Sequence, residues 1–383
     1  MNILYVRFED FPYGSAPSFR AFTLAKLMAE AGNCVTILAP NINFLENEID
    51  EDGIYKVMPS IRAVSFNEIG GSVEKSLSIL LEHDEYDIFM RPTSIKNFNS
   101  TLKIVKKYDI PIIMDSVEWY DSSNWRLKYL DPRYYIFQYM WRYKFTKCNG
   151  IIAISRLIEN HYKKSLSNVV RIPTITDVKN TKYRTEIKDD RVTFIFSGKL
   201  DEGKDNLDTF IEALDRVDHS SDRTKLNIYG PSRDEVKKHL GEKAFLLDEH
   251  KNIVIYGRVP QQEAQLACLN SDFSVFFRLN RRSANAGFPT KLGECMTFGT
   301  PVICNDTGDI SLVVNNKENG FLLKSKSVDE ISETLDYLLK MTKEERKEMR
   351  KQARLSAESF FDYRNYTDKI KSIFENSDRK SVV

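Results

Sequence analysis

Short runs of β-branched and aromatic residues alternate with longer amphipathic stretches along the whole chain. Such alternation predicts parallel sheets with helices on both faces. In the first half of the chain we expect strands near residues 3–6, 35–38, 87–90, 112–114, 151–154 and 169–172. In the second half we expect them near residues 193–196, 226–229, 253–256, 273–277, 301–305 and 320–323. Each set fits a doubly wound, Rossmann-like domain, which binds ligands outside the carboxyl ends of its strands.

The length of the chain also indicates two domains. A chain of 383 residues is too long for one hydrophobic core, because single cores seldom grow past about 250–300 residues. The polar stretch 173–189 separates the two sets of predicted strands and reads as a crossing between domains. We therefore predict an α/β protein with one Rossmann-like domain over residues 1–180 and a second over residues 181–359.

The composition narrows the class of protein. The chain is 42% hydrophobic and 29% charged, which is typical of a soluble globular protein. Its net charge of +1 gives no general attraction to nucleic acid, so we expect no nucleic-acid partner. The five cysteines are odd in number and scattered, as free thiols of a reducing cytosol would be. With no signal-peptide pattern and no apolar run near ~18 residues, we expect a cytoplasmic protein.

The segment 287–323 is the most informative part of the chain, because it predicts a loop, a helix, a glycine stop and a buried strand in one run. Pro289 suits the first helical turn, and Gly299 suits its end. The first-turn N–H groups of Thr290 and Lys291, the helix dipole and the Lys291 ammonium predict a phosphate receptor. Glu294, one turn further in, can accept two hydrogen bonds from a vicinal diol such as ribose. Together these groups predict a nucleotide site.

This segment resembles the signature of retaining, family-4 type glycosyltransferases of the GT-B fold, in a branch that writes it as Ala-Gly-Phe-Pro-Thr-Lys followed by Glu. The resemblance implies that Glu294 holds the nucleotide ribose and that Phe288, Thr290 and Lys291 contact the donor. The usual pattern has a further Glu eight positions earlier, where this chain has Ala286, so the carboxylate often assigned to the transferred sugar is absent. A buried helix and strand pair of another α/β protein is the alternative.

A second anion-binding corner is expected where the strand near residues 193–196 ends in Gly198 and a helix follows. It resembles the family's Gly-Arg-Leu…Lys element, with Lys199 in place of Arg. The resemblance implies that Lys199 and Lys204 hold the diphosphate, whereas surface lysines are otherwise usually solvated. It also implies that the base lies against the loop after residues 253–256, at Gly257, Arg258 and Val259.

The first half is expected to hold the acceptor. Gly14 and Ser15 form a loop at a helix start, which resembles the family's glycine loop at the donor phosphates and the acceptor. Arg20, one turn into that helix, is a candidate for either ligand, and a tight turn with an exposed arginine is the alternative. In the GT-B fold the two domains face a cleft, and the resemblance implies that residues 360–383 form a C-terminal helix that docks back on the first domain.

Acids and aromatics follow the strand at residues 112–114, at its carboxyl end. Asp115 or Glu118 could orient an acceptor hydroxyl, while a helix-capping role for Asp115 is equally open. Trp119 and Tyr120 could stack on a sugar face. Relatives often carry a His here, and this chain has none.

Aromatic and basic residues are interleaved over residues 125–147. This pattern suits a membrane interface or a lipid-linked acceptor. A helix that packs its aromatic side chains into the core is the alternative, and exposure decides between the two. Possible peripheral contact with the inner membrane face is therefore one of our expectations.

Several kinds of site are not expected. We find no Asp-x-Asp after an apolar strand and no His/Cys cluster with ligand spacing, so we expect no catalytic metal. None of the five histidines looks like a catalytic base. No phosphate-binding Gly-x-x-x-x-Gly-Lys-Ser/Thr motif and no Gly-x-Gly-x-x-Gly after the first strand occur, which argues against an ATPase and against a dinucleotide enzyme. No cofactor is expected.

These features lead to one principal hypothesis. We expect a metal-independent, retaining hexosyltransferase that uses a UDP or GDP sugar and a glycan or lipid-linked saccharide acceptor, in cell-surface polysaccharide biosynthesis. Lys199, Lys204 and Glu294 are the expected catalytic residues. Two alternatives are a nucleotide-sugar epimerase, which would recruit Asp115 or Glu118, and a non-catalytic nucleotide-binding subunit, which the Ala at position 286 favours.

Overall fold

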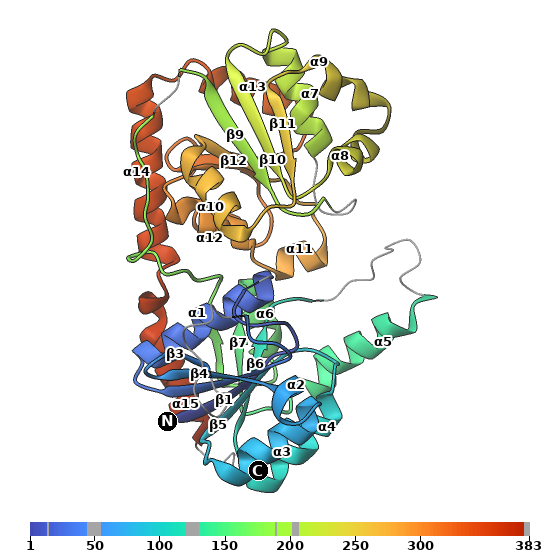
Figure 1. Ribbon diagram of the computed structural model, residues 1–383, viewed down its shortest axis with the longest axis vertical. Coiled ribbons are helices and arrows are strands. Elements are labelled where there is room, and N and C mark those ends of the chain that lie inside the picture. Colours follow the sequence, from blue (N-terminus) through green and yellow to red (C-terminus); the bar gives the residue numbers. More distant parts are fainter. Residues whose placement is uncertain (14, 44–54, 120–129, 188–189, 201–206, 379–383) are drawn as a thin grey trace. The chain divides into compact units, whose positions relative to one another are not determined.

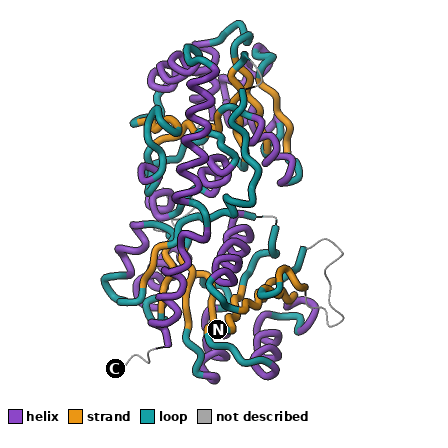
Figure 2. Tube along the Cα trace, turned by 90° about the vertical axis from the view of Figure 1, so that its left-hand side faces the viewer, coloured by secondary structure: helices purple, strands orange, loops and turns teal. Residues whose placement is uncertain are grey.

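The computed structural model describes residues 1–13, 15–43, 55–119, 130–187, 190–200 and 207–378 (Figure 1). The chain forms two compact units. Unit 1 contains Met1–Ile175, Ala286–Phe288 and Tyr363–Val383, and unit 2 contains Thr176–Asn285 and Pro289–Asp362. In both units helices flank a sheet (Figure 2). This arrangement confirms the predicted α/β class with two doubly wound, Rossmann-like domains.

The sheet of unit 1 has eight strands in the order β3-β4-β2-β1-β5-β6-β7-β8, and all neighbours are parallel except β3 and β4. The strands are β1 (Asn2–Val6), β2 (Cys34–Ala39), β3 (Tyr55–Met58), β4 (Ile61–Ser65), β5 (Ile88–Pro92), β6 (Ile112–Ser116), β7 (Gly150–Ala153) and β8 (Val169–Arg171). Every strand expected in the first half is present. The sequence did not predict β3 and β4, since Arg62 interrupts the apolar run of β4. Its guanidinium donates to Asp84 and Tyr86.

The helices of unit 1 are α1 (Ala16–Glu30), α2 (Phe66–Ile69), α3 (Val73–His83), α4 (Phe98–Val105), α5 (Pro132–Tyr139), α6 (Arg156–Tyr162) and α15 (Thr367–Asp378). A π-helical turn, η3 (Met140–Lys144), continues α5. Helix α15 packs against α1, β7 and β8, and its Ile370, Ile373 and Phe374 are at most 1% exposed. The C-terminal helix is therefore part of the core of unit 1.

The sheet of unit 2 has six parallel strands in the order β11-β10-β9-β12-β13-β14. They are β9 (Val192–Ser197), β10 (Thr224–Tyr229), β11 (Ile253–Gly257), β12 (Phe273–Val275), β13 (Val302–Asn305) and β14 (Gly320–Leu323), all of them expected. The helices are α7 (Leu207–Val217), α8 (Arg233–Leu240), α9 (Leu246–Glu249), α10 (Gln261–Asn270), α11 (Arg282–Ala286), α12 (Thr290–Thr297), α13 (Val328–Leu338) and α14 (Lys343–Phe360).

The strand order locates the ligand edge of each unit. In unit 2 the chain runs outward from β9 to β10 and β11, then returns to the other side of β9 with β12. In unit 1 the same reversal falls between β1 and β5. Ligands of doubly wound sheets bind at the carboxyl ends of the strands beside such a reversal. The candidate sites are therefore the carboxyl ends of β9 and β12, and of β1 and β5.

A buried ion pair lies near the carboxyl end of β6 in unit 1. Arg20 is 4% exposed and Asp115 is fully buried. Nη2 of Arg20 lies 2.8 Å from Oδ1 of Asp115, and the guanidinium also donates to the carbonyls of Ile172 and Pro173. Tyr5 donates its hydroxyl to the same carboxylate over 3.1 Å. This burial favours the structural role that the sequence left open for Asp115, and the alternative of an exposed Arg20 is wrong.

We expect Asp115→Ala to lower the free energy of unfolding of unit 1 by about 3–5 kcal/mol, because it leaves the Arg20 charge buried without its partner. All three tryptophans lie between residues 119 and 141, so tryptophan fluorescence during guanidinium denaturation reports on unit 1 alone. The control is Lys163→Ala, which removes the surface pair with Glu159 and should change stability by less than about 1 kcal/mol. Equal effects of the two substitutions would contradict the structural role of the buried pair.

Candidate functional site

Three glycines end neighbouring strands at the carboxyl edge of unit 2. Gly198, Gly230 and Gly257 follow or end β9, β10 and β11 and have φ angles of +138°, +112° and +69°. Gly198 N–H donates to Tyr229 O over 2.9 Å, and Gly230 N–H donates to Gly257 O over 2.7 Å. A Cβ on Gly230 would lie 2.2 Å from the carbonyl oxygen of Gly198. Only glycine permits this approach, so the edge is built largely from bare backbone.

The ammonium group of Lys291 lies over this edge. Its Nζ is 2.0 Å from the place where a Cβ of Gly198 would stand, and 4.8 Å from the ring centroid of Phe196. A cation over an aromatic face is attracted by the ring's negative face. Lys291 belongs to α12, which follows β12, whereas Gly198 follows β9. The two residues therefore meet beside the reversal of strand order.

Helix α12 begins with an uncapped first turn. Pro289 is the N-cap, one position before the first helical turn where the sequence had placed it, and no side chain caps the helix. The first turn also holds no acidic residue. The helix ends at Thr297, and the expected glycine stop follows the C-cap at Gly299, which has a φ of +72°. Its positive dipole end, with Thr290 and Lys291 in the first turn, is suited to an anion.

Glu294 lies one turn into α12 and is only partly exposed. Burial raises the pKa of Glu294 from about 4.5 to about 7, although the positive charge of Lys291 lowers it. The Glu294 carboxylate forms no hydrogen bond or ion pair with any residue that the structure describes. A carboxyl group whose pKa is raised to near 7, and which lies beside a cation without a hydrogen-bond partner, is typical of a functional position.

Some of the other residues predicted to bind the donor lie at the same edge of unit 2, and others lie elsewhere. Lys199 is exposed directly after Gly198, and the exposed Arg258 and partly exposed Val259 follow β11. Phe288 belongs to unit 1 and is 5% exposed. Its carbonyl accepts from the hydroxyl of Thr174 over 3.5 Å. Lys204 and Gly14 lie outside the described residues, and so does Tyr120. Ser15 caps α1 by accepting from the N–H of Ser18.

A cavity of about 380 Å³ lies at the carboxyl ends of β1, β5 and β6 in unit 1. Its lining is formed by Arg7, Glu9, Pro17, Pro92, Thr93, Ser94, Ile95, Val117, Glu118, Arg133 and Phe137. The exposed Glu118 is the predicted acceptor residue that reaches it. Nη2 of Arg7 is 3.0 Å from Glu9, while the buried Nε of Arg7 has no hydrogen-bond partner in the described part of unit 1. The cavity lining thus includes an acid and basic side chains.

Trp119 packs against other aromatic residues of unit 1. Its ring stacks on Trp141 with centroids 4.6 Å apart and planes 14° apart, and it also contacts His161. Its Nε1 donates to Gln138 over 3.3 Å. One face of the indole is therefore already covered, which argues against the predicted stacking on a sugar from that side.

The sequence missed several residues of these sites. Arg7 and Gly230 each directly follow a buried strand, which is the same pattern that indicated the other candidate residues. Arg133 and Phe137 lie on α5, and they line the cavity because the tertiary structure places this helix beside the strand ends. Sequence analysis sought His and Cys at ligand spacing and did not predict that Asp215, His219 and His250 converge in unit 2. The i, i+4 spacing of Asp215, on α7, and His219, just past the end of α7, was the available signal.

No helix among the described residues is both long enough and apolar enough to span a bilayer. Exposure over residues 130–147 is divided between two faces. Tyr134, Met140 and Trp141 are at most 8% exposed, so part of the segment packs into the core. The opposite face is exposed and carries Leu130, Tyr135, Ile136, Tyr139 and Tyr143, with exposed fractions between 51% and 76%. We call these five residues the aromatic face.

Comparison with known proteins agrees with the two-unit fold. Residues 177–356, which are nearly all of unit 2, match the family described as Glycosyl transferases group 1. A search of curated proteins finds no match. A glycosyltransferase from Rickettsia africae superposes with a TM-score of 0.70 at 16% identity, covering 99% of each chain. Sucrose-phosphate synthase from Thermosynechococcus elongatus superposes with a TM-score of 0.69 at 13% identity, covering 98% of each chain.

A third similar structure is Anabaena HepE in complex with UDP-glucose, with a TM-score of 0.66 at 13% identity, covering 98% of this chain and 99% of the other. Similarity at these identities shows the fold, which is that of the GT-B glycosyltransferases, as predicted. Together with the matched family segment, it makes this chain a glycosyltransferase.

We expect Glu294→Gln to stabilise unit 2 at pH 8 but not at pH 4.5. Native Glu294 keeps its proton up to pH ~7, whereas the unfolded chain loses it near pH 4.5. The native state therefore binds more protons over this interval, and the wild-type stability falls as pH rises through it. Glutamine does not titrate, so the variant should gain about 1–3 kcal/mol relative to wild type by pH 8, with most of the gain between pH 4.5 and 7.

Differential scanning calorimetry at pH 4.5, 6, 7 and 8 measures this difference. The control is Glu348→Gln on α14, a glutamate that is 56% exposed, measured at the same four pH values. A pH-independent difference for Glu294→Gln would contradict the raised pKa.

Proposed function

We propose that this glycosyltransferase transfers a hexose-type sugar from a UDP or GDP sugar to a hydroxyl of a glycan or lipid-linked saccharide, with retained anomeric configuration and without a catalytic metal. Cell-surface polysaccharide biosynthesis is the proposed setting. The observation that carries the donor assignment is the meeting of Lys291, the uncapped start of α12 and bare Gly198 at the reversal of strand order, with Glu294 one turn further along.

The donor is proposed to bind along this edge. Lys291 and the first-turn N–H groups of α12 would hold the diphosphate, with the exposed Lys199 beside them and Lys204 as a further predicted cation. Glu294 would accept two hydrogen bonds from the ribose diol, and the loop after β11 at Gly257, Arg258 and Val259 would receive the base. The complex of Anabaena HepE with UDP-glucose supports a nucleotide sugar as donor.

The hard step of such a transfer is departure of the diphosphate as positive charge develops on the sugar ring. Preorganised donors aimed at the leaving oxygens lower this barrier, and a charged hydrogen bond contributes ~1.5–3 kcal/mol. Lys291 is already held over Gly198 and Phe196, so little reorganisation is needed when the donor binds. The acceptor hydroxyl would arrive on the same face of the sugar and give its proton to the departing phosphate oxygen.

We expect Lys291→Ala and Glu294→Ala each to lower kcat/KM for the nucleotide sugar ~10-fold or more, equivalent to at least ~1.4 kcal/mol of transition-state stabilisation. Lys291→Ala should act mainly on kcat, because the charge of the leaving diphosphate grows in the transition state. Glu294→Ala should act mainly on KM, since the ribose does not change in the reaction. Steady-state kinetics with UDP and GDP sugars measures both effects.

Lys351→Ala on α14 is the matched control, since that lysine is 60% exposed, and it should leave both constants unchanged. A thermal-shift panel of UDP, GDP and their sugars separates loss of binding from loss of chemistry, because a ligand of the native state raises its stability in proportion to ln(1 + [L]/Kd). Near-normal kinetics of both variants would remove the donor site proposed here. Binding of a nucleotide without turnover would favour the non-catalytic alternative.

The acceptor is proposed to bind in the cavity of unit 1. Glu118 would accept a hydrogen bond from an acceptor hydroxyl, and the exposed Arg133 would donate to another oxygen. Helix α5 lines this cavity with Arg133 and Phe137, while its other side carries the aromatic face. Exposed basic residues accompany that face at Arg142 and Lys147. Aromatic and basic side chains together suit the headgroup region of an anionic bilayer, so a lipid-linked acceptor is favoured.

We expect the double substitution Tyr139→Ser/Tyr143→Ser to weaken co-sedimentation with phosphatidylglycerol vesicles at least fivefold, because it removes two amphipathic rings from the aromatic face. Binding to neutral phosphatidylcholine vesicles should already be weaker for the wild type, since the basic residues then lose their counter-charge. Tyr108→Ser is the control, because Tyr108 is 41% exposed elsewhere in unit 1. Unchanged sedimentation of the double variant would contradict the membrane contact.

A further inference from the structure

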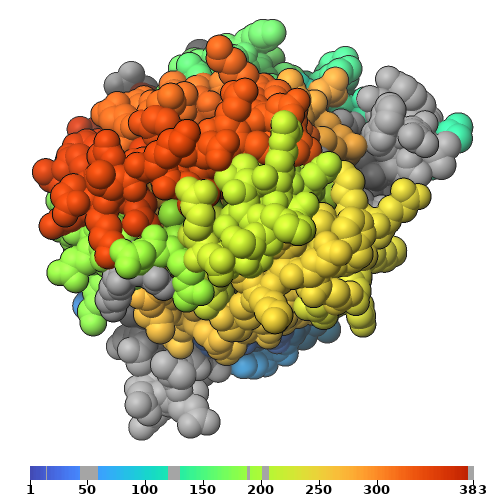
Figure 3. Space-filling model, turned by 90° about the horizontal axis from the view of Figure 1, so that it is seen from above, coloured from blue at the N-terminus to red at the C-terminus, as the bar shows by residue number. Residues whose placement is uncertain are grey.

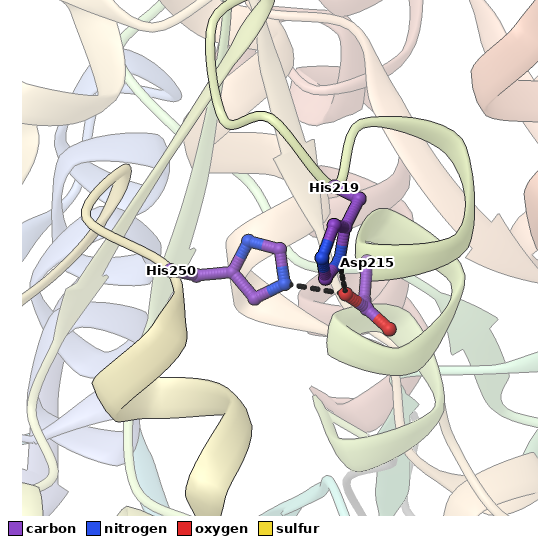
Figure 4. Close-up of side chains that lie close together, drawn as sticks. All are labelled: Asp215, His219 and His250. Carbon is purple, nitrogen blue, oxygen red and sulfur yellow. Dashed lines mark hydrogen bonds and ion pairs between the residues drawn. The ribbon is translucent and has the colours of Figure 1, made fainter.

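A cluster of two histidines and an aspartate lies in unit 2, outside the proposed donor site (Figure 4). Oδ1 of Asp215 is 2.7 Å from Nδ1 of His219 and 2.7 Å from Nε2 of His250. These ligand atoms all lie within 4.8 Å of one another. Asp215 belongs to α7, His219 follows the end of that helix, and His250 follows α9. Two separate segments therefore direct three potential ligand atoms to one point.

The buried histidine is held in a defined orientation. His250 is 2% exposed, and its Nδ1 lies 2.9 Å from Oγ of Ser221. Ser221 has a φ of +62°, which is uncommon for a residue other than glycine. Its N–H donates to Asp218 O over 2.9 Å, which holds this turn. One nitrogen of His250 is thus fixed by a hydroxyl while the other faces Asp215. Metal-binding histidines are commonly oriented by such a partner on the second nitrogen.

We propose that Asp215, His219 and His250 bind a divalent transition-metal ion of the zinc class, with solvent completing the coordination. Two imidazole nitrogens and one carboxylate oxygen match the ligands that Zn²⁺ takes at about 2.0–2.2 Å. Magnesium and calcium prefer an all-oxygen set, so they fit this cluster poorly. The His219 side chain is 77% exposed, which leaves a path for the ion and for a water ligand.

The place of the cluster indicates a structural effect of the ion. His219 precedes β10 and His250 precedes β11, so the cluster lies at the amino ends of these strands, whereas Gly230 and Gly257 lie at their carboxyl ends. The segment 207–250 forms part of the face of unit 2 that Figure 3 shows in light green to yellow. A bound ion would join the end of α7 to the α9–β11 connection. It would stabilise unit 2 without taking part in sugar transfer.

Cobalt(II) tests this proposal, because tetrahedral Co²⁺ absorbs visible light far more strongly than hydrated Co²⁺. Tag-free full-length protein carrying Cys34→Ser, which removes the exposed thiol, is treated with EDTA and titrated with CoCl₂. We expect a d–d band that saturates near one equivalent and that ZnCl₂ abolishes. His219→Ala should weaken Co²⁺ binding at least tenfold. His83→Ala, at the exposed end of α3 in unit 1, should leave it unchanged.

Calorimetry provides a second measurement that does not depend on absorbance. ZnCl₂ should raise the unfolding temperature of unit 2 in the Cys34→Ser protein and in His83→Ala, but much less in His219→Ala and Asp215→Asn, because only an ion bound to the native state stabilises it. Sugar transfer should persist in EDTA, which separates this proposal from the proposed enzymatic function. Absence of a saturable band, or equal binding by His219→Ala and His83→Ala, would overturn the metal site and leave the cluster as a hydrogen-bonded clamp.

Discussion

The close approach of glycine backbones at the carboxyl edge of unit 2 is the constraint on which the donor site depends. A side chain on Gly230 would strike the rigid backbone of Gly198, and one on Gly198 would take the place of the Lys291 ammonium. The first contact sets the ends of β9 and β10 against each other. The second brings a cation from α12, on the far side of the strand reversal, to the end of β9. Both contacts require the missing Cβ atoms rather than any particular side chain.

Buried charge is handled in opposite ways in the two units. In unit 1, the Asp115 carboxylate is matched by Arg20 and by the hydroxyl of Tyr5, so its burial serves the fold. In unit 2, burial raises the pKa of Glu294, and the positive charge of Lys291 offsets this effect only in part. An acid that costs stability without a ligand is a recurrent feature of binding sites. The contrast separates a structural carboxylate from a functional one more clearly than exposure does.

The sequence was sufficient for features that depend on local pattern. The strands stand out as β-branched runs, and the start of α12, its glycine stop and the position of Glu294 follow from short-range rules of helix formation. Contacts between residues far apart in the chain could not be predicted from the sequence. The pairing of Arg20 with Asp115, the approach of Gly230 to Gly198 and the convergence of His250 on Asp215 each require the folded sheet to bring distant segments together. β3 and β4 were missed because polar residues, among them Lys56 and Arg62, interrupt their apolar runs.

The membership of α15 in unit 1 has a consequence for biosynthesis. The ribosome releases Met1–Ile175 first, yet the sheet and α1 of that unit lack one covering layer until residues 367–378 have emerged, after the whole of unit 2. Domains generally fold as they leave the ribosome, from the N-terminus onward. Here the later unit is the first whose segments are all present. Apolar surface of the nascent first unit therefore stays exposed until α15 has been synthesised. During this time the surface is a binding site for chaperones.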